Sequence, residues 1–310
     1  MATLKELSKK DELLSGGHRL CAGCGIPPIV RLILRSTDSG IVASSATGCL
    51  EVGTTVYPYS AWRIPWIHSA FENSAATITG VETAYRALKK RGRIPDRDIK
   101  FIAFGGDGGT YDIGLQSLSG ALERGHNFLY VCYDNGAYMN TGIQRSSATP
   151  FSSNTTTSPA GTVIPGKQEW RKDLTRIVAA HNVPYAAQAS PHNWSDLSKK
   201  AEKALKIDGP TFLNVMSPCP LGWYTKSEDS IKLAKLSVDT CYWMLYEIEE
   251  GVLRITYRPK EKRPLAEWLQ PQGRFKHLFK PENSAILEKF QARVDLEWQR
   301  LNELDGKQIF

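Results

Sequence analysis

Two short apolar runs flank a helix-like segment near the middle of the chain. Residues 101–104 are entirely apolar and lead into a glycine-rich turn, and residues 128–133 form a second run of β-forming side chains. Residues 111–124, between them, have the character of a helix. Continuous apolar runs are typical of parallel strands that are buried on both faces, so the pattern predicts a strand–helix–strand unit. Both strands end in polar loops at the carboxyl edge of the sheet, where open α/β sheets bind ligands.

Further elements are predicted on both sides of this unit. Residues 146–168 are rich in Ser, Thr, Pro and Gly and have no hydrophobic period, which predicts a long irregular loop of the kind that is often functional. The whole pattern predicts an α/β fold with a doubly wound, mostly parallel sheet. Helices are expected at residues 27–36, 73–91, 172–181, 194–207, 231–247 and 283–305, and strands at residues 41–43 and 212–216.

The character of the chain changes near its C-terminal end. We divide it into a domain of residues 1–224 and a helical, basic C-terminal extension of residues 225–310. Residues 252–280 of the extension carry eight Lys or Arg against two Glu. One interpretation is a solvated arm. We favour an arm that packs on partner subunits, because large aromatic side chains are poor residues to leave in water. The aromatic residues concerned are Trp243, Trp268 and Phe275.

Bulk composition excludes several classes of protein. Of 310 residues, 41% are hydrophobic and 23% are charged, which suits a globular chain with a substantial core. The sequence has no apolar run of about 18 residues or more and no signal-peptide pattern, so we expect a cytoplasmic protein without membrane contact. A formal net charge of +7 suggests an acidic partner. Nucleic acid is not expected as a ligand, since no nucleic-acid-binding motif is recognisable.

The two polar loops of the central unit carry specific chemistry. In the first, Asp107 lies among Gly106, Gly108 and Gly109. Glycines let the backbone approach a phosphate closely, and the N-terminus of the following helix directs its N–H groups at the anion. Asp107 and Asn135 are oxygen ligands 28 residues apart, and adjacent parallel strands bring them together. Such ligands beside a diphosphate suit Mg²⁺ or Ca²⁺. A plain glycine turn is the alternative, and the second loop at matching spacing argues against it.

Four of the six cysteines stand in loop-like contexts. Cys21 and Cys24 form a C-x-x-C turn, and Cys49 and Cys219 follow predicted strands at the same sheet edge as the glycine loop. Four such thiolates suit a [4Fe–4S] cluster or a Cys₄ zinc site, and a redox-active C-x-x-C pair is a further alternative. The lack of an export signal argues against a disulfide framework. The other two cysteines fall in apolar stretches, a strand and a helix, and are interpreted as buried bystanders: Cys132 and Cys241.

Several further motifs occur between these sites. In order, the motifs are His18-Arg19-Leu20-Cys21-Ala22-Gly23-Cys24-Gly25, Ala46-Thr47-Gly48-Cys49-Leu50-Glu51-Val52, Tyr57-Pro58-Tyr59, Trp66-Ile67-His68, Gly105-Gly106-Asp107-Gly108-Gly109, Asp134-Asn135, Tyr138-Met139-Asn140-Thr141-Gly142-Ile143-Gln144 and Ser217-Pro218-Cys219-Pro220. Taken together, they resemble the β subunit of the pyruvate:ferredoxin oxidoreductase family. The resemblance extends over residues 18–223 and returns weakly at residues 271–277.

The resemblance implies a fold of the thiamine-diphosphate-binding type and a role for individual residues. It implies a [4Fe–4S] cluster held by Cys21, Cys24, Cys49 and Cys219. It implies Mg²⁺ bound by Asp107, Asn135 and the carbonyl of Ala137. Asn140 would be the catalytic residue that faces the thiazolium and the substrate adduct. The implied cofactor-binding residues are Cys49, Gly106, Asp107, Gly108, Gly109, Asn135, Gly136, Ala137, Tyr138, Asn140 and Thr141.

The resemblance also implies partners. Thiamine enzymes use one domain for the diphosphate and another for the pyrimidine, and this chain has room only for the first. The Glu that activates the pyrimidine would therefore lie on another subunit, and further [4Fe–4S] clusters on a third chain would pass electrons to ferredoxin.

We assign no catalytic role to His68, Glu51 or Glu72. A lone histidine at a strand end is more often only hydrogen-bonded, and the two glutamates are interpreted as helix caps.

Two departures from the family pattern bear on the substrate. Ile26 and Gly136 each stand where the family commonly has Glu, so two negative charges are missing. Less repulsion would favour a dianion such as oxalate, whose oxidation yields only CO₂ without coenzyme A. We favour oxalate; the alternative is oxidation of pyruvate or a branched-chain 2-oxo acid, which consumes coenzyme A. A non-catalytic iron–sulfur or zinc-binding subunit is a remoter alternative. The complete set of Asp107, Asn135 and Asn140 argues against it.

Overall fold

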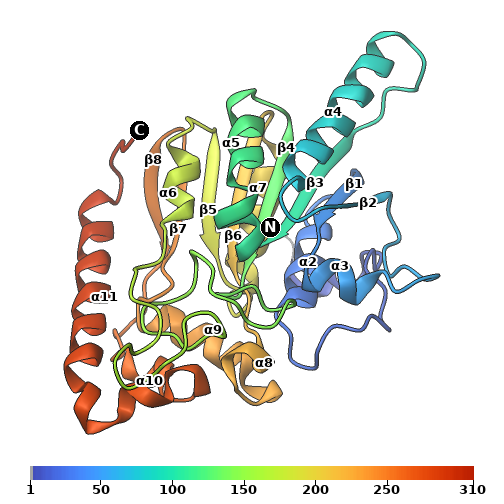
Figure 1. Ribbon diagram of the computed structural model, residues 1–310. Helices are drawn as coiled ribbons and strands as arrows, with labels where there is room; N and C mark the ends of the chain where they lie inside the picture. Colours follow the sequence, from blue (N-terminus) through green and yellow to red (C-terminus); the bar gives the residue numbers. More distant parts are fainter. Residues whose placement is uncertain (1–2) are drawn as a thin grey trace.

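An eight-stranded sheet organises residues 3–310, the part of the chain that this computed structural model describes. Its strand order is β2-β1-β3-β4-β6-β5-β7-β8 (Figure 1). The first six strands in that order are parallel, and β7 and β8 are antiparallel additions at one edge. The strands are β1 (Gly40–Ala46), β2 (Trp66–Ser69), β3 (Ile99–Gly106), β4 (Phe128–Asp134), β5 (Tyr185–Ala189), β6 (Pro210–Met216), β7 (Leu245–Glu249) and β8 (Val252–Tyr257).

Helices cover both faces of the sheet, which confirms the predicted doubly wound α/β fold (Figure 1). On one face lie α2 (Ile26–Leu34) and α7 (Trp194–Lys206). The opposite face carries α4 (Ser74–Lys90), α5 (Leu115–Glu123) and α6 (Leu174–Ala179). None of the helices in residues 3–310 is long and apolar enough to cross a membrane. The other α-helices are α1 (Leu4–Leu7), α3 (Cys49–Thr54), α8 (Pro220–Trp223), α9 (Ser230–Asp239), α10 (Ala266–Leu269) and α11 (Ser284–Leu304).

The central strand β4 shows why the apolar runs of the sequence are continuous. All seven of its residues are buried. Leu129 and Val131 pack into the core layer beneath α2 and α7. Phe128 and Tyr130 pack into the layer beneath α4 and α5. Since both layers need apolar side chains, a parallel strand between them has no polar face.

Five of the six predicted helices are confirmed, with ends shifted by a few residues. The helix predicted for residues 231–247 is wrong in its second half. There α9 ends at Asp239, the chain turns, and β7 pairs antiparallel with β5 and β8. Cys241 therefore lies in a turn, with a φ of 57°, and not in a helix. A strand forms because pairing with β5 satisfies the backbone of an exposed sheet edge, which helical spacing cannot anticipate.

The C-terminal residues do not stand apart from the rest of the chain. Their strands β7 and β8 extend the sheet of residues 1–224. Trp243, Trp268 and Phe275 are each 0% exposed, in a core that they share with α9 and α11. The chain itself therefore buries these three aromatic side chains, and the argument that a partner subunit must cover them is wrong. Contact of residues 225–310 with partner subunits stays a prediction.

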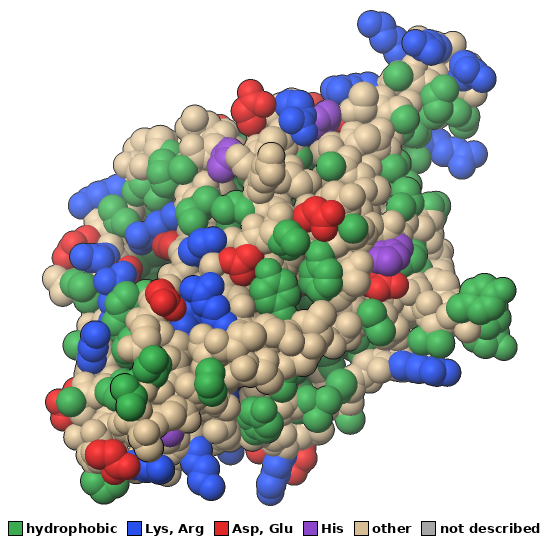
Figure 2. Space-filling model, in the orientation of Figure 1, with side chains coloured by type: hydrophobic (Ala, Val, Ile, Leu, Met, Phe, Trp, Pro, Cys, Tyr) green, Lys and Arg blue, Asp and Glu red, His purple; other side chains and the backbone are tan. Residues whose placement is uncertain are grey.

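The excess of positive charge is partly concentrated on one projection. Helix α4 and the turn after it extend beyond the sheet, and Lys and Arg side chains gather at this tip (Figures 1 and 2). The residues of α4's last turns and of the following turn that supply them are Arg86, Lys89, Lys90, Arg91, Arg93 and Arg97.

Candidate functional site

Four loops meet at the carboxyl edge of the parallel sheet. They follow β1, β3, β4 and β6, and these strands are neighbours in the order β1-β3-β4-β6. The register pairs Gly106 with Tyr133 and Asp134 with Met216, so the last residues of the three central strands lie level with one another. The four loops therefore begin side by side, which is the topological reason that residues far apart in sequence form one site.

A pocket lies between the loops that follow β1, β3 and β4, and Phe71 from the loop after β2 also lines it. Ten of the eleven residues predicted to bind the cofactor line it; Gly136 does not. Asn140 and Thr141 are the exposed residues among them. Five further residues line the pocket that the prediction did not include. They are Thr47, Gly48, Phe71, Tyr133 and Met139.

Three oxygen-bearing groups converge at the floor of this pocket. The side-chain amide of Asn135 lies 2.8 Å from Asp107 Oδ1 and 2.9 Å from the carbonyl oxygen of Ala137. The amide of Asn135 can be oriented in two ways. If its nitrogen faces Asp107 and Ala137, it donates a hydrogen bond to both of their oxygens. If its oxygen faces them, three oxygens face one point, which only a bound cation would make favourable. The arrangement thus fits a hard divalent cation held by Asp107, Asn135 and Ala137.

Asp107 is a buried carboxylate that lacks a cationic partner among residues 3–310. It is 1% exposed, and its oxygens accept hydrogen bonds from the backbone N–H of Asn135 (3.3 Å) and from Ser146 Oγ (2.5 Å). Burial raises the pKa of Asp107 well above its usual range, and the neighbouring Asp134 raises it further. A divalent cation would reverse this effect, because an opposite charge favours the ionised carboxylate.

Close backbone approach explains the glycines beside Asp107. A Cβ atom at Gly108 would lie 2.4 Å from the ring of Tyr138. The segment Gly108–Ile113 forms a π-helical turn before α5, so the predicted helix of residues 111–124 is divided in two. Above the turn, the hydroxyl of Tyr133 is buried in the pocket wall without a hydrogen-bond partner. A polar ligand in the pocket would satisfy it.

The four predicted cluster cysteines lie beside this pocket. Cys49 begins α3 and lines the pocket itself. The C-x-x-C turn is held against the Cys219 loop, where the N–H of Gly25 donates to the carbonyl of Pro218 (2.9 Å). Cys219 Sγ accepts from the N–H of Gly222 at 3.3 Å.

The thiols of these cysteines are electrostatic neighbours. Burial, together with repulsion from thiolates at Cys219, Cys24 and Cys21, raises the pKa of Cys49 to about 12. Burial, together with repulsion from Cys219 and Cys21, likewise raises the pKa of Cys24 to about 12. Within residues 3–310, however, no three His, Cys, Asp or Glu side chains meet closely enough for a single metal ion. As predicted, the other two cysteines are buried away from this group: Cys132 and Cys241.

Asp134, at the end of β4, is held by a salt bridge that the sequence pattern did not predict. Arg171 Nη2 donates to Asp134 Oδ2 at 2.6 Å, and the hydroxyl of Tyr111 donates to the same oxygen at 2.7 Å. The side chains of Asp134 and Arg171 are 3% and 21% exposed. Arg171 also lies 4.6 Å from the ring centroid of Trp243. This network fixes the strand end that carries Asn135.

We expect Arg171→Met to destabilise the protein by about 3–5 kcal/mol, because it leaves a buried carboxylate without its charge partner. Urea denaturation measures the loss. Arg176→Met is the control: its bridge to Asp173 has a more exposed carboxylate, so roughly 1 kcal/mol or less is expected. The double variant Asp134→Asn, Arg171→Met should recover much of the loss. Equal destabilisation by Arg171→Met and Arg176→Met would contradict the assignment of Asp134 and Arg171 as a buried ion pair.

The contacts of His68 match its interpretation as a hydrogen-bonded histidine at the end of a strand. It is the penultimate residue of β2, and its Nε2 lies 2.7 Å from Thr47 Oγ1 and 3.8 Å from Glu51 Oε2. The ring stacks near Trp66, with 6.3 Å between centroids. Neither His68 nor Glu51 lines the pocket.

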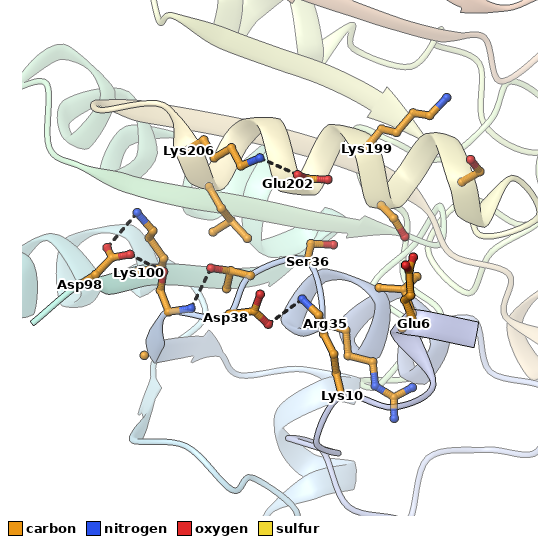
Figure 3. Close-up of a pocket in the computed structure, with 17 residues that line it drawn as sticks. Glu6, Lys10, Arg35, Ser36, Asp38, Asp98, Lys100, Lys199, Glu202 and Lys206 are labelled. Atoms are coloured by element: carbon orange, nitrogen blue, oxygen red, sulfur yellow. Dashed lines mark hydrogen bonds and ion pairs between the residues drawn. The ribbon is translucent and has the colours of Figure 1, made fainter. Parts of the chain in front are cut away.

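A wider hollow, of about 870 Å³, lies at the opposite edge of the sheet (Figure 3). It adjoins Gly40 and Lys100, at the amino ends of β1 and β3. Its charges are mostly paired within the chain, as Lys10 is with Asp38 (2.8 Å) and Lys206 with Glu202 (2.5 Å). It therefore presents no concentrated charge of one sign. It also lies at the opposite edge of the sheet from the carboxyl ends of the strands, where α/β proteins bind ligands.

Comparison with known proteins agrees with this geometry. The family described as "Thiamine pyrophosphate enzyme, C-terminal TPP binding domain" matches residues 46–215. The pyruvate synthase subunit PorB of Thermotoga maritima is 52% identical over 97% of this chain and 94% of its own length. PorB of Methanocaldococcus jannaschii is 51% identical over 92% of this chain and 95% of its own. The ketoisovalerate oxidoreductase subunit VorB of Pyrococcus abyssi is 41% identical, with 95% and 94% covered.

The fold also matches a solved structure. A chain of 2-oxoglutarate:ferredoxin oxidoreductase from Magnetococcus marinus superposes with a TM-score of 0.52 and 21% identity, covering 69% of this chain and 76% of that one. The fold and the pocket define a thiamine-diphosphate-binding domain. The chain belongs to the 2-oxoacid:ferredoxin oxidoreductase family, as a β subunit of the PorB kind.

Proposed function

We propose that this chain is the β subunit of a pyruvate:ferredoxin oxidoreductase, with thiamine diphosphate, Mg²⁺ and one [4Fe–4S] cluster as its cofactors. The reaction converts pyruvate and coenzyme A to acetyl-coenzyme A, CO₂ and a proton, and it releases two electrons that pass singly to ferredoxin. The names of the relatives support pyruvate as the substrate, because two of the three named above are pyruvate synthase subunits.

The observation that carries the proposal is the double role of Cys49. It lines the pocket together with Asp107 and Asn140, and its thiol is an electrostatic neighbour of the other three cysteines. A cluster held there would lie directly beside the pocket. Thiamine diphosphate, when bound, supplies a nucleophilic carbon and an electron sink. An adjoining cluster allows electrons to leave the site one at a time.

The residues of the pocket have distinct tasks in this proposal. Asp107, Asn135 and the carbonyl of Ala137 would hold Mg²⁺, and the π-helical turn that begins at Gly108 would receive the diphosphate. Asn140 is exposed and lines the pocket, and in this proposal it donates a hydrogen bond to the substrate. Asp107 is buried and bound to Ser146, so it positions the cation and does not transfer protons.

The four thiols are close enough to influence one another's charge: in addition to burial, Cys219, Cys24 and Cys21 all raise the pKa of Cys49. We propose that they hold a [4Fe–4S] cluster. A Cys₄ zinc site is the alternative, and iron analysis of the purified complex distinguishes the two. The N–H of Gly222 that faces Cys219 Sγ is the kind of donor that stabilises cluster thiolates.

Our preference for oxalate is not supported. The relatives are named for pyruvate and ketoisovalerate, and none of these names includes oxalate. The physical argument also fails, because neither position with a missing charge lines the pocket. Ile26 is 1% exposed and packs in the core at the start of α2. At Gly136 an added Cβ would point at Arg274, on the other side of the loop.

The proposal includes partner chains. Asp107 is the one carboxylate among the described residues that line the pocket, and it belongs to the Mg²⁺ ligands. The Glu that activates the pyrimidine would therefore come from another subunit, with the active site at their interface. Other chains would carry further [4Fe–4S] clusters on the way to ferredoxin.

The test is dye reduction by the purified, oxygen-free complex. We expect rapid reduction of a viologen with pyruvate and coenzyme A, at least tenfold slower reduction with 2-ketoisovalerate, and none with oxalate. The isolated chain should bind Mg²⁺ and thiamine diphosphate weakly and turn over no substrate. Oxalate activity that exceeds pyruvate activity would overturn the substrate assignment. Turnover by the isolated chain would overturn the shared active site.

A further inference from the structure

A buried arginine behind the Asn135 loop has no partner for its charge. Arg274 is 2% exposed. Its Nε donates to Gln272 Oε1 at 2.9 Å, but its Nη1 has no hydrogen-bond partner. No carboxylate in residues 3–310 forms an ion pair with it at 4.0 Å or less. A charge out of water is costly unless it is paired, so this guanidinium needs an anionic or polar neighbour.

Aromatic rings surround the guanidinium and hold it in place. Its centre lies 4.4 Å from the ring centroid of Trp223, 5.0 Å from that of Phe275 and 5.8 Å from that of Trp268. Burial lowers the pKa of Arg274 to about 10, and it remains charged at neutral pH. Rings stabilise the flat faces of the cation, but they cannot accept the N–H bonds directed along its edge.

Arg274 borders a small, partly open cavity. The other residues that line this cavity are Asp134, Asn135, Gly136, Ala148, Pro150, Arg171, Met216, Trp223, Tyr242 and Trp268. A second donor there is also unsatisfied, because Trp268 Nε1 is buried without a partner. The two residues that carry these donors, one of them cationic, both line the same cavity. Neither donor can accept a hydrogen bond, so an occupant of the cavity that accepts hydrogen bonds would suit both.

The other charges near the cavity leave this requirement in place. Asp134 also borders it, but Arg171 and Tyr111 already bind the carboxylate of Asp134. Asp107 lies on the far side of the loop and faces the pocket described above. Against the larger effect of burial, Tyr242, Cys219, Asp134 and Asp107 raise the pKa of Arg274, in that order of size, but none of them accepts a hydrogen bond from its Nη1.

The size of the cavity limits the kind of anion that it can hold. Its volume is about 10 Å³, which leaves room for roughly one water molecule. Phosphate, acetate and other polyatomic anions are too large. A single halide ion fits, and N–H donors with apolar walls suit its weak hydration better than the hydration of a carboxylate.

We propose that the cavity between Arg274 and Trp268 is a binding site for a small monovalent anion of the chloride type. The ion accepts from Arg274 Nη1 and Trp268 Nε1 and neutralises the buried charge. The same wall supports the Mg²⁺ loop, since Trp223 Nε1 donates to the carbonyl of Asn135 at 2.7 Å. Occupancy of the site therefore stabilises the loop from behind.

Bromide locates the site directly. Crystals of the assembled complex, soaked in sodium bromide, should give an anomalous bromine peak between Arg274 Nη1 and Trp268 Nε1. In solution, chloride or bromide should raise the melting temperature over potassium gluconate of equal ionic strength by roughly 2–4 °C, and the rise should saturate. A cavity that holds water in bromide-soaked crystals, with equal melting temperatures in the two salts, would overturn the proposal.

Two variants separate the site from general salt effects. Arg274→Met removes the charge, and the bromine peak and the halide-dependent rise should both be lost. Gly136→Asp tests the same point if the first variant does not fold. A Cβ at Gly136 lies 3.1 Å from Arg274 Nη1, so the new carboxylate takes the place of the anion. Aspartate is among the residues that tolerate the φ of 81° at this position. A bromine peak that persists in Gly136→Asp would also contradict the proposal.

Discussion

Asp107→Asn is expected to weaken Mg²⁺-dependent binding of thiamine diphosphate by about 10²–10³-fold, since a pair of unit charges 4 Å apart is worth about 4 kcal/mol at an effective dielectric of 20. Asparagine keeps the shape of the side chain: its Oδ1 can still accept from the N–H of Asn135, while its Nδ2 takes the place of Oδ2 and can donate to Ser146 Oγ. What it removes is the negative charge that Mg²⁺ requires. Titration calorimetry of the complex with thiamine diphosphate at saturating Mg²⁺ measures the change.

The same substitution should act in the opposite direction on stability. The buried carboxylate of Asp107 has a raised pKa, because burial and Asp134 disfavour its ionised form. Removing the charge relieves this cost, so the metal-free Asp107→Asn protein should unfold at the same temperature as the wild type or higher. A loss of binding without a loss of stability distinguishes a metal ligand from a structural residue.

Asp112→Asn is the matched control. Asp112 lies in the same π-helical turn, accepts from the backbone N–H of Ser147 at 2.9 Å, and does not line the pocket. Binding of thiamine diphosphate to this variant should stay within a few-fold of the wild type. Wild-type affinity in Asp107→Asn, or equal losses in the two variants, would show that Asp107 is not the metal ligand.

Local sequence signals were sufficient for the strands and loops that form the pocket. The apolar runs before Asp107 and Asn135 are continuous because both faces of β3 and β4 are covered. The glycines that follow β3 are needed where Tyr138 and Phe71 approach the backbone. Tertiary contacts require these features, but each leaves a local mark in the sequence, a run of apolar residues or a group of glycines, so they could be predicted without knowing which contacts are involved.

Features that depend on one particular bonding partner could not be predicted. Arg171 meets Asp134 from 37 residues away, just after the segment that has no hydrophobic period. The π-helical turn depends on the bond from the N–H of Gly114 to the carbonyl of Gly109 (2.7 Å), five residues back. The strand β7 forms because β5 offers an edge. None of these partners can be recognised from the spacing of apolar residues alone.

The error about Gly136 has a similar cause. Its position directly after Asn135 suggested that it faces the same pocket. The backbone at Gly136 has a φ of 81°, which turns the residue to the other side of the loop, where Arg274 lies. Adjacent residues in a loop need not share an environment, because a left-handed backbone conformation reverses the direction of the side chain.

Cys219→Ala is expected to remove the cluster. Anaerobically purified complex should lose about four irons per copy of this chain relative to the wild type, together with the corresponding part of its brown absorbance and all pyruvate-dependent dye reduction. The loss is expected because Cys219 supplies one of the four proposed thiolate ligands and is the cysteine that the loop after β6 contributes. Iron analysis and visible absorbance measure it.

Cys241→Ala supplies the comparison that separates cluster binding from stability. Cys241 is 2% exposed and packs in the C-terminal core, so its removal also leaves a small cavity. It does not interact with the four cluster thiols, and iron content should match the wild type. If Cys219→Ala keeps its iron, or both variants lose it, the four-cysteine assignment is wrong. Zinc in place of iron in the wild type would assign the same thiols to a structural metal, and electrons could not then leave the pocket through Cys49.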